Sequence, residues 1–419
     1  MLTEHPVAAG QHVTLNDTVS IGCWLHGDWA VRSGSASFSR RMGTACVSVA
    51  LALTVSGWAR GETTALRTTD FEFLSHGLTL SGVISQPAHG EARALIVFVH
   101  GYGTTDVRGG EMYLDLRSRF ARLGIASVIW DKPGQGRSEG AFDINQPVAS
   151  SAQEVLDAVA HLRTHRIPGS HRIGLWGISR AGWIAPLALT RDPDIKFWIS
   201  VSGVTAEDNY FYLLKANLPH EGSTVEEADV LMQEWKRGRQ LFRDGGSYED
   251  YRAATKRVRA NPYIRRMIDL ELSRDRYELE QAKLRAAGKP PPVDEETGMP
   301  LYIEQFDVLL GNLAIDVLAL FGERDLNVDW SKTRALYEST LGQNDQASLT
   351  IHTFPAGNHV IDVAETGSLR EMAGMSMRRK CDGYYTAQLE WLKEHVLDDG
   401  HAGRIRDLAD QRTGQRVRR

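Results

Sequence analysis

The chain has 419 residues, 42% of them hydrophobic and 24% charged, so it is long enough for one large globular domain with an insertion or for two domains. Its 48 lysines and arginines against 53 aspartates and glutamates leave a net charge of −5, which favours neither nucleic acid nor an anionic membrane as a partner. The three cysteines form no Cys-x-x-Cys pair and the 14 histidines no His-Glu-x-x-His pattern, so the sequence predicts neither a metal site nor a redox dithiol.

The N-terminal extension, residues 1–61, has the parts of a secretory signal peptide. Arg40 and Arg41 precede a short apolar stretch at 44–55, and Gly57 and Ala59 follow it at small-x-small spacing. The stretch is shorter than the roughly 20 apolar residues that cross a bilayer. We therefore expect a periplasmic or secreted protein with no membrane span left after cleavage; a buried core helix in a cytoplasmic protein is the alternative.

From residue 66 to 397, apolar runs alternate with helical patterns. A hairpin is predicted from 71–74 and 78–84 about Ser75-His76-Gly77, with further strands at 94–99, 125–130, 173–176, 195–201, 317–321 and 349–354. Helices are predicted at 112–123, 151–165 with Ser151 and Glu154 as a capping box, 181–189, 330–341 and 381–397. This alternation predicts an α/β fold with a mainly parallel central sheet flanked by helices.

Residues 206–313 interrupt the alternation with a polar helical insertion. Thr224 and Ser247 stand where helix caps are expected, and one helix carries an apolar face of Ala228, Leu231, Met232, Trp235 and Phe242. A second long helix is predicted from about Ile264 to Ala287, before three prolines. The Arg-rich tail, 398–419, is predicted to be solvated.

Ser179 lies in Gly177-Ile178-Ser179-Arg180-Ala181, between a buried strand and a helix. Small residues two positions before and after a serine are typical of the sharp strand–turn–helix elbow that presents a nucleophile. A serine hydroxyl needs a base to accept its proton and an acid to orient that base.

Asp325 and His359 each follow a later strand, as Ser179 follows an earlier one. In a parallel sheet such loops share the carboxyl edge, so we expect a Ser179–His359–Asp325 triad there, in the chain order Ser, Asp, His. Alternatives remain for two of its members: Glu323, Asp329 and Asp208 for the acid, and His352, inside a strand, for the base.

An oxyanion hole needs two backbone N–H groups. We expect them from Arg180, directly after the serine, and from Tyr102 in the loop His100-Gly101-Tyr102-Gly103, where the glycines permit a close turn. We interpret His100, and likewise Asp131 and Arg137 of the following loop, as residues that brace these loops.

Five motifs together carry a resemblance: Val99-His100-Gly101-x-Gly103, Asp131-x-Pro133-Gly134-x-Gly136-x-Ser138, Gly177-x-Ser179-x-Ala181-Gly182, Gly322-x-x-Asp325 and Gly357-Asn358-His359. The chain resembles the α/β-hydrolase-fold serine hydrolases, the broad esterase, thioesterase and serine aminopeptidase group. The resemblance implies that residues 206–313 form a lid and that no cofactor is needed; Gly134 and Gly136 also lack the pattern of a dinucleotide site.

The expected function is hydrolysis of a carboxylic ester, or another small-molecule acyl substrate, through an acyl-enzyme. An acyl thioesterase and a proline-type aminopeptidase or amidase are alternatives because one triad serves all three. A non-catalytic, hydrolase-like binding protein is the alternative outside enzymes, and an intact Ser/Asp/His set argues against it.

Overall fold

The structure is a computed structural model and describes residues 66–109, 112–288 and 290–398. The predicted signal peptide and almost all of the predicted polar tail lie outside these ranges, so both stay predictions. Within the described ranges, no helix combines the length and apolarity that crossing a bilayer requires.

Eight strands form one sheet, in the order β1-β2-β4-β3-β5-β6-β7-β8. The strands are β1 (Leu66–Ser75), β2 (Leu78–Pro87), β3 (Ala94–Val99), β4 (Ile125–Trp130), β5 (Ile173–Ile178), β6 (Phe197–Val201), β7 (Asp316–Gly322) and β8 (Ser348–Phe354). β1 and β2 form the predicted hairpin, β2 pairs antiparallel with β4, and all pairs from β4 to β8 are parallel.

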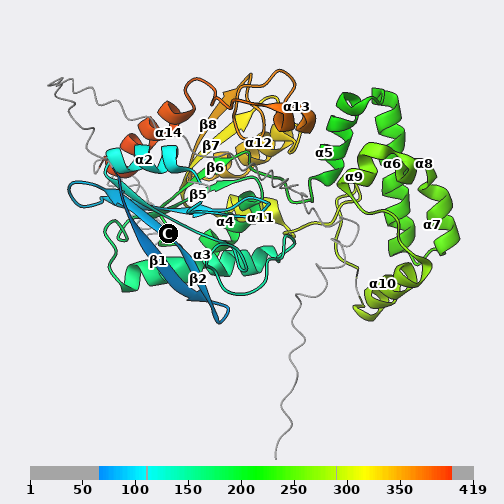
Figure 1. The fold of residues 1–419 in the computed structure, drawn as a ribbon, viewed down its shortest axis with the longest axis horizontal. Helices are drawn as coiled ribbons and strands as arrows, with labels where there is room; N and C mark the ends of the chain where they lie inside the picture. Colours follow the sequence, from blue (N-terminus) through cyan, green and yellow to red (C-terminus); the bar gives the residue numbers. More distant parts are fainter. Residues whose placement is uncertain (1–65, 110–111, 289, 399–419) are drawn as a thin grey trace, which may run out of the picture.

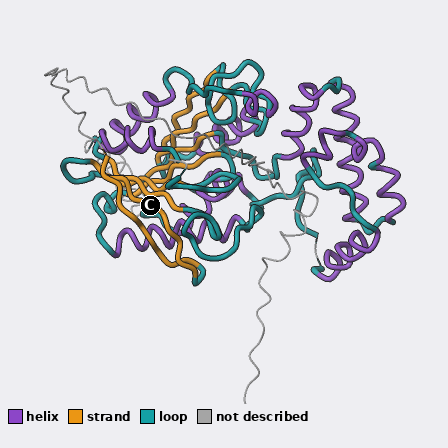
Figure 2. Tube along the Cα trace, viewed as in Figure 1, coloured by secondary structure: helices purple, strands orange, loops and turns teal. Residues whose placement is uncertain are grey.

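Helices cover both faces of the sheet (Figures 1 and 2). α3 (Val148–Thr164), α4 (Ala181–Arg191), α11 (Phe306–Gly311) and α12 (Trp330–Ser339) pack on one face, and α2 (Leu114–Arg122) and α14 (Tyr384–Leu392) on the other. Short 3₁₀ and π turns, η2 (Leu341–Gln343) and η3 (Lys393–Leu397), follow α12 and α14, and α13 (Leu369–Gly374) precedes α14. This is the α/β-hydrolase fold that the sequence predicts.

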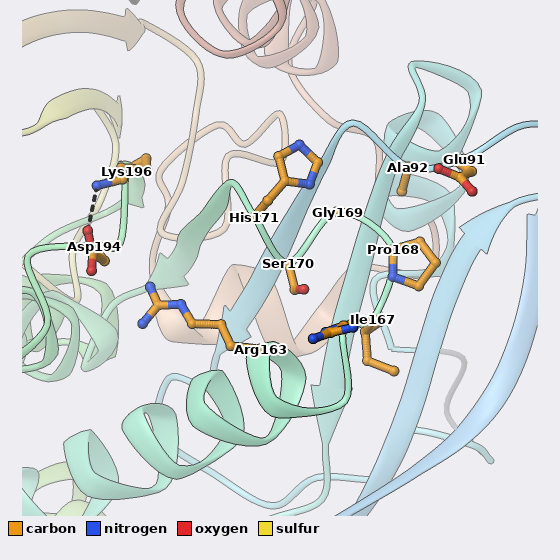
Figure 3. Close-up of a pocket in the computed structure, with 11 residues that line it drawn as sticks. Glu91, Ala92, Arg163, Ile167, Pro168, Gly169, Ser170, His171, Asp194 and Lys196 are labelled. Carbon is orange, nitrogen blue, oxygen red and sulfur yellow. Dashed lines mark hydrogen bonds and ion pairs between the residues drawn. The ribbon is translucent and has the colours of Figure 1, made fainter. Parts of the chain in front are cut away.

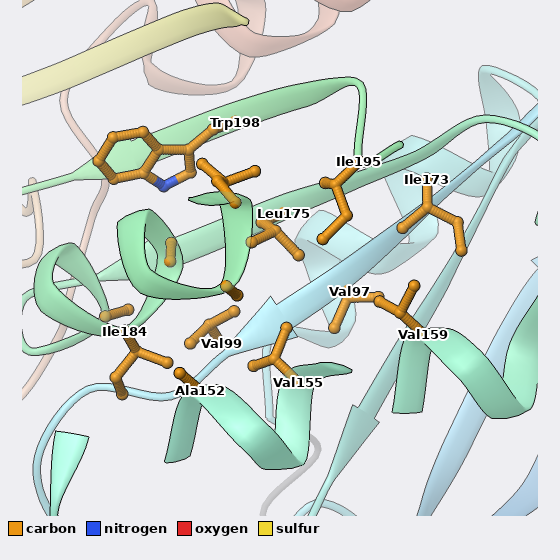
Figure 4. Packing of buried hydrophobic residues seen from close by; sticks show 14 of the residues in the cluster. Val97, Val99, Ala152, Val155, Val159, Ile173, Leu175, Ile184, Ile195 and Trp198 are labelled. Atoms are coloured by element: carbon orange, nitrogen blue, oxygen red, sulfur yellow. The ribbon is translucent and has the colours of Figure 1, made fainter. Parts of the chain in front are cut away.

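The core lies between the sheet and these helices because the central strands are apolar on both faces. Every residue of β3, β4 and β5 is buried. Figure 4 shows Val97 and Val99 of β3 and Leu175 of β5 packed against Val155 of α3 and Ile184 of α4. Continuous apolar runs are what a sheet covered by helices requires, which explains why the sequence predicts these strands so closely.

The strand order reverses direction beside β3. The chain passes from β3 to β4 on one side, then returns to place β5 on the other side of β3 and continues outward through β6, β7 and β8. In an open α/β sheet, such a reversal is the usual place of a site, at the carboxyl ends of the strands on either side of it.

Between β6 and α11 the chain forms a separate group of helices, on the right of Figure 1. They are α5 (Tyr210–Asn217), η1 (Leu218–Glu221), α6 (Val225–Arg243), α7 (Tyr248–Ala254), α8 (Lys256–Ala260), α9 (Pro262–Met267) and α10 (Arg274–Ala286), with their own apolar cluster. Thr224 caps α6 in a complete capping box and Ser247 caps α7, as predicted.

The long helix predicted from Ile264 to Ala287 is wrong. An extended segment separates α9 from α10, and in it Ile268, Leu270 and Leu272 are buried while Asp269 and Glu271 are exposed. This alternation has the period of a strand, so it buries one side of an extended chain and cannot continue a helix. Ser273 then caps α10.

Two predicted helix starts are also wrong. α3 begins at Val148, one turn before the predicted capping box; Ser151 is already inside the helix, and its hydroxyl donates to the Gln146 side chain. α14 begins at Tyr384 rather than Cys381 because Gly383 has φ +87°, a left-handed conformation outside a helix. The short apolar run around Val308 forms helix α11.

Candidate active site

Ser179 lies on the sharp turn that joins β5 to α4. Its φ of +57° is left-handed, a conformation that costs a non-glycine residue roughly 1–2 kcal/mol. The turn is held by hydrogen bonds from Ser179 N to Val201 O (3.0 Å) and from Gly182 N to Ser179 O (2.7 Å). A Cβ on Gly177 would lie only 2.6 Å from the Cβ of Ala181, so the elbow requires the small residue that the sequence has there.

His359 and Asp325 form a buried pair. His359 Nδ1 donates to Asp325 Oδ2 at 2.8 Å, and the Asp325 side chain is fully buried. The other Asp325 oxygen accepts from Asn327 N (2.8 Å) and Val328 N (3.0 Å), and these two hydrogen bonds keep the side chain in place. Because Nδ1 carries a proton, Nε2 of His359 is left as the basic nitrogen.

The end of β6 links the elbow to the histidine loop. Ser179 N bonds to Val201 O, and the hydroxyl of the next residue, Ser202, donates to His359 O at 2.7 Å. Among the described residues, the Ser179 hydroxyl and the His359 ring make no direct hydrogen bond; such bonds often tighten only when substrate is bound.

The alternative acids and the alternative base lie elsewhere. Asp208 accepts from Tyr210 N and from the Tyr302 hydroxyl. Asp329 caps α12 through Lys332 N, Glu323 is exposed, and His352 is exposed on β8. Of these acids, only Asp325 bonds to His359.

The Tyr102 loop lies against the elbow. A Cβ on Gly101 would lie 3.6 Å from the Ser179 Cβ and 3.1 Å from Ile178 O. Arg180 contributes more here than the sequence indicates, because its buried guanidinium lies 5.5 Å from the centre of the Tyr102 ring and donates to Ser151 Oγ at 3.2 Å. The two expected oxyanion residues are thus neighbours.

Lys132, which no sequence pattern marks as a site residue, contacts this loop. Its Nζ donates to Gly101 O (2.7 Å) and Gly103 O (2.8 Å). Burial, aided by the charge of Arg180 and opposed by Glu154, lowers the pKa of Lys132 to about 7. In the motif Asp131-Lys132-Pro133 no local pattern marks this lysine, and only the folded loop reveals its partners.

His100 braces the same loop, as predicted. Its Nε2 donates to Trp130 O, and burial, followed by the charge of Lys132, lowers the pKa of His100 to about 3. Asp131 also braces, accepting from Val107 N at 2.8 Å, while Arg137 pairs with exposed Asp70. A Cβ on Gly136 would lie 2.0 Å from the Asp131 carboxylate, which explains why position 136 has a glycine.

A second residue missed from the sequence is Tyr302, between α10 and α11. Its hydroxyl donates to Asp208 Oδ2 (3.0 Å) and accepts from the Tyr102 hydroxyl (3.0 Å), and its ring packs on Trp183, 4.3 Å between centres. Tyr302 therefore joins the C-terminal part of the insertion to the Tyr102 loop.

A cavity of about 580 Å³ lies at the opposite edge of the sheet (Figure 3). It is lined by the segments that lead into β3, β5 and β6, including Ala92, Gly169 and the ion pair of Lys196 with Asp194. It therefore lies at the amino ends of the strands, away from Ser179, Asp325 and His359.

The sequence model of the X-Pro dipeptidyl-peptidase (S15) family matches residues 76–293, just over half of the 419 residues. The chain belongs to this S15 family. The matched region contains the Tyr102 loop and Ser179, whereas Asp325 and His359 follow it.

Among curated proteins, the S15 chain is 30% identical over 101 residues to the thiohydrolase apmlB of Arthrinium phaeospermum. The match covers 24% of this chain and 32% of that protein, so it spans about a third of the length of the relative.

Several solved hydrolases are similar in fold. The Pyrococcus furiosus esterase Pf2001 has a TM-score of 0.45 at 14% identity, over 82% of this chain and 96% of that one. Est1E of Butyrivibrio proteoclasticus has a TM-score of 0.43 at 14% identity, over 78% of this chain and 98% of that one. The Pyrococcus horikoshii acylaminoacyl peptidase has a TM-score of 0.43 at 17% identity, over 80% of this chain and 42% of that one.

Proposed function

We propose that the chain is a serine hydrolase that cleaves a carboxylic ester through an acyl-enzyme. The proposal rests above all on the buried His359–Asp325 pair, which shares one sheet edge with a serine on a strained elbow. A left-handed serine is unfavourable by itself, and such strain is found where function requires it.

In this mechanism Ser179 Oγ attacks the carbonyl carbon while His359 Nε2 accepts the hydroxyl proton. The N–H groups of Tyr102 and Arg180 stabilise the resulting oxyanion. The C–O bond to the alcohol then breaks, His359 returns the proton to the alcohol, and the acyl group stays on Ser179. Water, activated by His359, attacks the acyl-enzyme and releases the acid, and Ser179 regains its proton. Asp325 orients the imidazole and stabilises its charged form throughout.

A fluorophosphonate probe tests this proposal because it reacts covalently with activated serines. We expect the wild-type chain to be labelled and Ser179→Ala to remain unlabelled. Ser151→Ala, which removes a buried serine hydroxyl from α3, is the matched control and should still be labelled. Equal labelling of the Ser179→Ala variant, or none of the wild type, would exclude the proposal.

Two other substrate classes each have one supporting observation. The thiohydrolase relative favours a thioester, and the family of X-Pro dipeptidyl-peptidases favours a peptide bond after proline. A panel of an aryl ester, a matched acyl thioester and an X-Pro anilide decides among them by kcat/KM. We expect the ester to be cleaved fastest; a higher kcat/KM for the anilide would make the protein a peptidase.

We propose further that the helical insertion acts as a lid over the site. Three side chains of the insertion bond to the Asp325 loop: Tyr212 to Asp325 O (3.0 Å), Asn217 to Leu326 O (3.0 Å) and Asn209 to Asn327 O (2.6 Å). Tyr302 adds the contact with Tyr102 (3.0 Å). The insertion is thus tied to both loops between which a substrate would bind.

Export remains part of the proposal, on the signal-like residues 40–59 alone. N-terminal sequencing of the mature protein tests it: a start shortly after Ala59 or Gly61 would support export, and a retained Met1 or Met42 on a cytoplasmic protein would contradict it.

A further inference from the structure

Lys132 is a half-buried cation whose side-chain hydrogen bonds all go to one loop. It follows β4 directly, its backbone N–H donates to Thr105 Oγ1 (2.8 Å), and its Nζ reaches Gly101 O (2.7 Å) and Gly103 O (2.8 Å). The ammonium therefore bonds to the carbonyl groups on both sides of Tyr102. Removing a lysine ammonium from water costs free energy, and here the partly buried ammonium bonds only to neutral carbonyl groups. Its position therefore needs an explanation.

The geometry of the peptide group supplies one. The Gly101 carbonyl and the Tyr102 N–H belong to the same planar trans peptide, so they point in opposite directions. An ammonium that holds the carbonyl on one side consequently fixes the N–H on the other. It also polarises the peptide, and a polarised peptide is a stronger hydrogen-bond donor.

We infer that Lys132 is a positioning residue, whose ammonium group orients and strengthens the Tyr102 N–H as an oxyanion donor. The inference rests on the proposed serine-hydrolase function, and it assigns to the 131–138 loop a part in turnover beyond bracing. The contribution appears only when negative charge develops on the substrate oxygen, so it affects kcat more than KM.

Three charged or titratable groups face Lys132 from the elements around it: Arg180 at the start of α4, Glu154 on α3 and His100 at the end of β3. With a pKa of about 7, Lys132 changes charge near neutral pH. The neutral amine still donates to the two carbonyls but no longer polarises the peptide through its charge. Turnover should therefore fall above about pH 7, as Lys132 loses its charge.

The test compares Lys132→Met with Lys236→Met. Lys236 is the matched control because its Nζ also donates to two backbone carbonyls, Glu295 O (2.8 Å) and Glu296 O (2.6 Å), in the helical insertion. Exhaustive fluorophosphonate labelling counts the folded active sites of each variant, so kcat for an aryl ester is expressed per site from about pH 5 to about pH 9.

We expect Lys132→Met to lower kcat per site about tenfold and to change KM by less than about twofold. Loss of a whole oxyanion donor lowers kcat roughly 10²–10³-fold, so the loss of a residue that only positions the donor should lower it less. The falling limb of the Lys132→Met profile above neutral pH should disappear, whereas Lys236→Met should keep the wild-type profile. A purely structural lysine would lower the number of active sites and leave the pH profile unchanged.

Two results would overturn the inference: a kcat per site of Lys132→Met within about twofold of the control, or a falling limb that persists in that variant. If the wild type is labelled on Ser179 and either result is found, the inference alone fails. If the wild type is not labelled at all, the proposed function fails and the inference falls with it.

Discussion

Asp325 and Asp208 are both buried carboxylates that follow strands of the same sheet, and their partners separate their roles. Asp325 accepts from His359, while Asp208 accepts from Tyr302. At the scale of single residues, the proposed triad thus depends on one contact that no spacing in the sequence encodes.

Asp325→Asn should lower kcat on the order of 10⁴-fold, because an amide in place of the carboxylate favours the wrong imidazole tautomer. Asp208→Asn, the matched control, keeps an acceptor for Tyr302 and should cost less than about tenfold. Steady-state hydrolysis of an aryl ester measures both. If Asp208→Asn were the more damaging change, Asp325 would not be the catalytic acid.

At the scale of elements, the β5–α4 elbow depends on the space around Gly177. Gly177→Ala places a Cβ 2.6 Å from the Cβ of Ala181, so the turn must open. We expect the free energy of unfolding to fall by about 1–3 kcal/mol, the usual cost of overpacking, and kcat to fall because Ser179 moves.

The control for the elbow is Gly311→Ala in α11, where an added Cβ meets nothing within 4 Å. Thermal unfolding and ester hydrolysis should leave that variant close to the wild type. A Gly177→Ala protein with wild-type stability and activity would contradict the steric account of the elbow.

The proposed lid also belongs to the scale of elements, because Tyr302 connects the insertion to the Tyr102 loop. Tyr302→Ala should open space beside the site and shift the ratio of kcat/KM between long-chain and short-chain esters by roughly tenfold, the value of a methylene or two in an apolar pocket. Val308→Ala, at an exposed position of α11, is the control. An unchanged ratio would contradict a lid that shapes the acyl pocket.

At the scale of the whole molecule, buried titratable groups near the site couple stability to pH. Burial lowers the pKa of His100 from 6.5 to about 3. Between pH 6.5 and pH 3, His100 is protonated in the unfolded chain but neutral in the folded chain. The contribution of neutral His100 to the free energy of unfolding is therefore fully present above about pH 6.5 and is lost as the pH falls toward 3.

His100→Gln should therefore weaken the dependence of stability on pH. The glutamine amide can still donate to Trp130 O but does not titrate, so the thermal midpoint should fall less between about pH 7 and about pH 5 than in the wild type. The slopes of thermal midpoint against pH are compared, not the midpoints themselves. The other titratable groups contribute equally to both slopes, and a constant packing cost of the variant does not change its slope. Parallel slopes for the two proteins would contradict the shift.

The central strands and the elbow were predictable because their causes are local. Runs such as Ala94–Val99 and Ile125–Trp130 are apolar enough to be buried on both faces, whatever surrounds them. The extended segment of Ile268 to Leu272 was missed because strongly helical sequences on both sides outweigh a short alternation.

The sequence by itself determined the order of strands and helices, the position of Ser179 on a tight turn, and the set of candidate acids and bases. These follow from periodicity and from the small side chains that a sharp turn demands. Only the tertiary structure decided that Asp325 contacts His359, that Asp208 faces Tyr302, and that Lys132 holds the Tyr102 loop. Each of these contacts joins segments far apart along the chain or on different strands. Their geometry depends on how the parallel strands pair and how the loops pack at the edge of the sheet. No local pattern of residues predicts either.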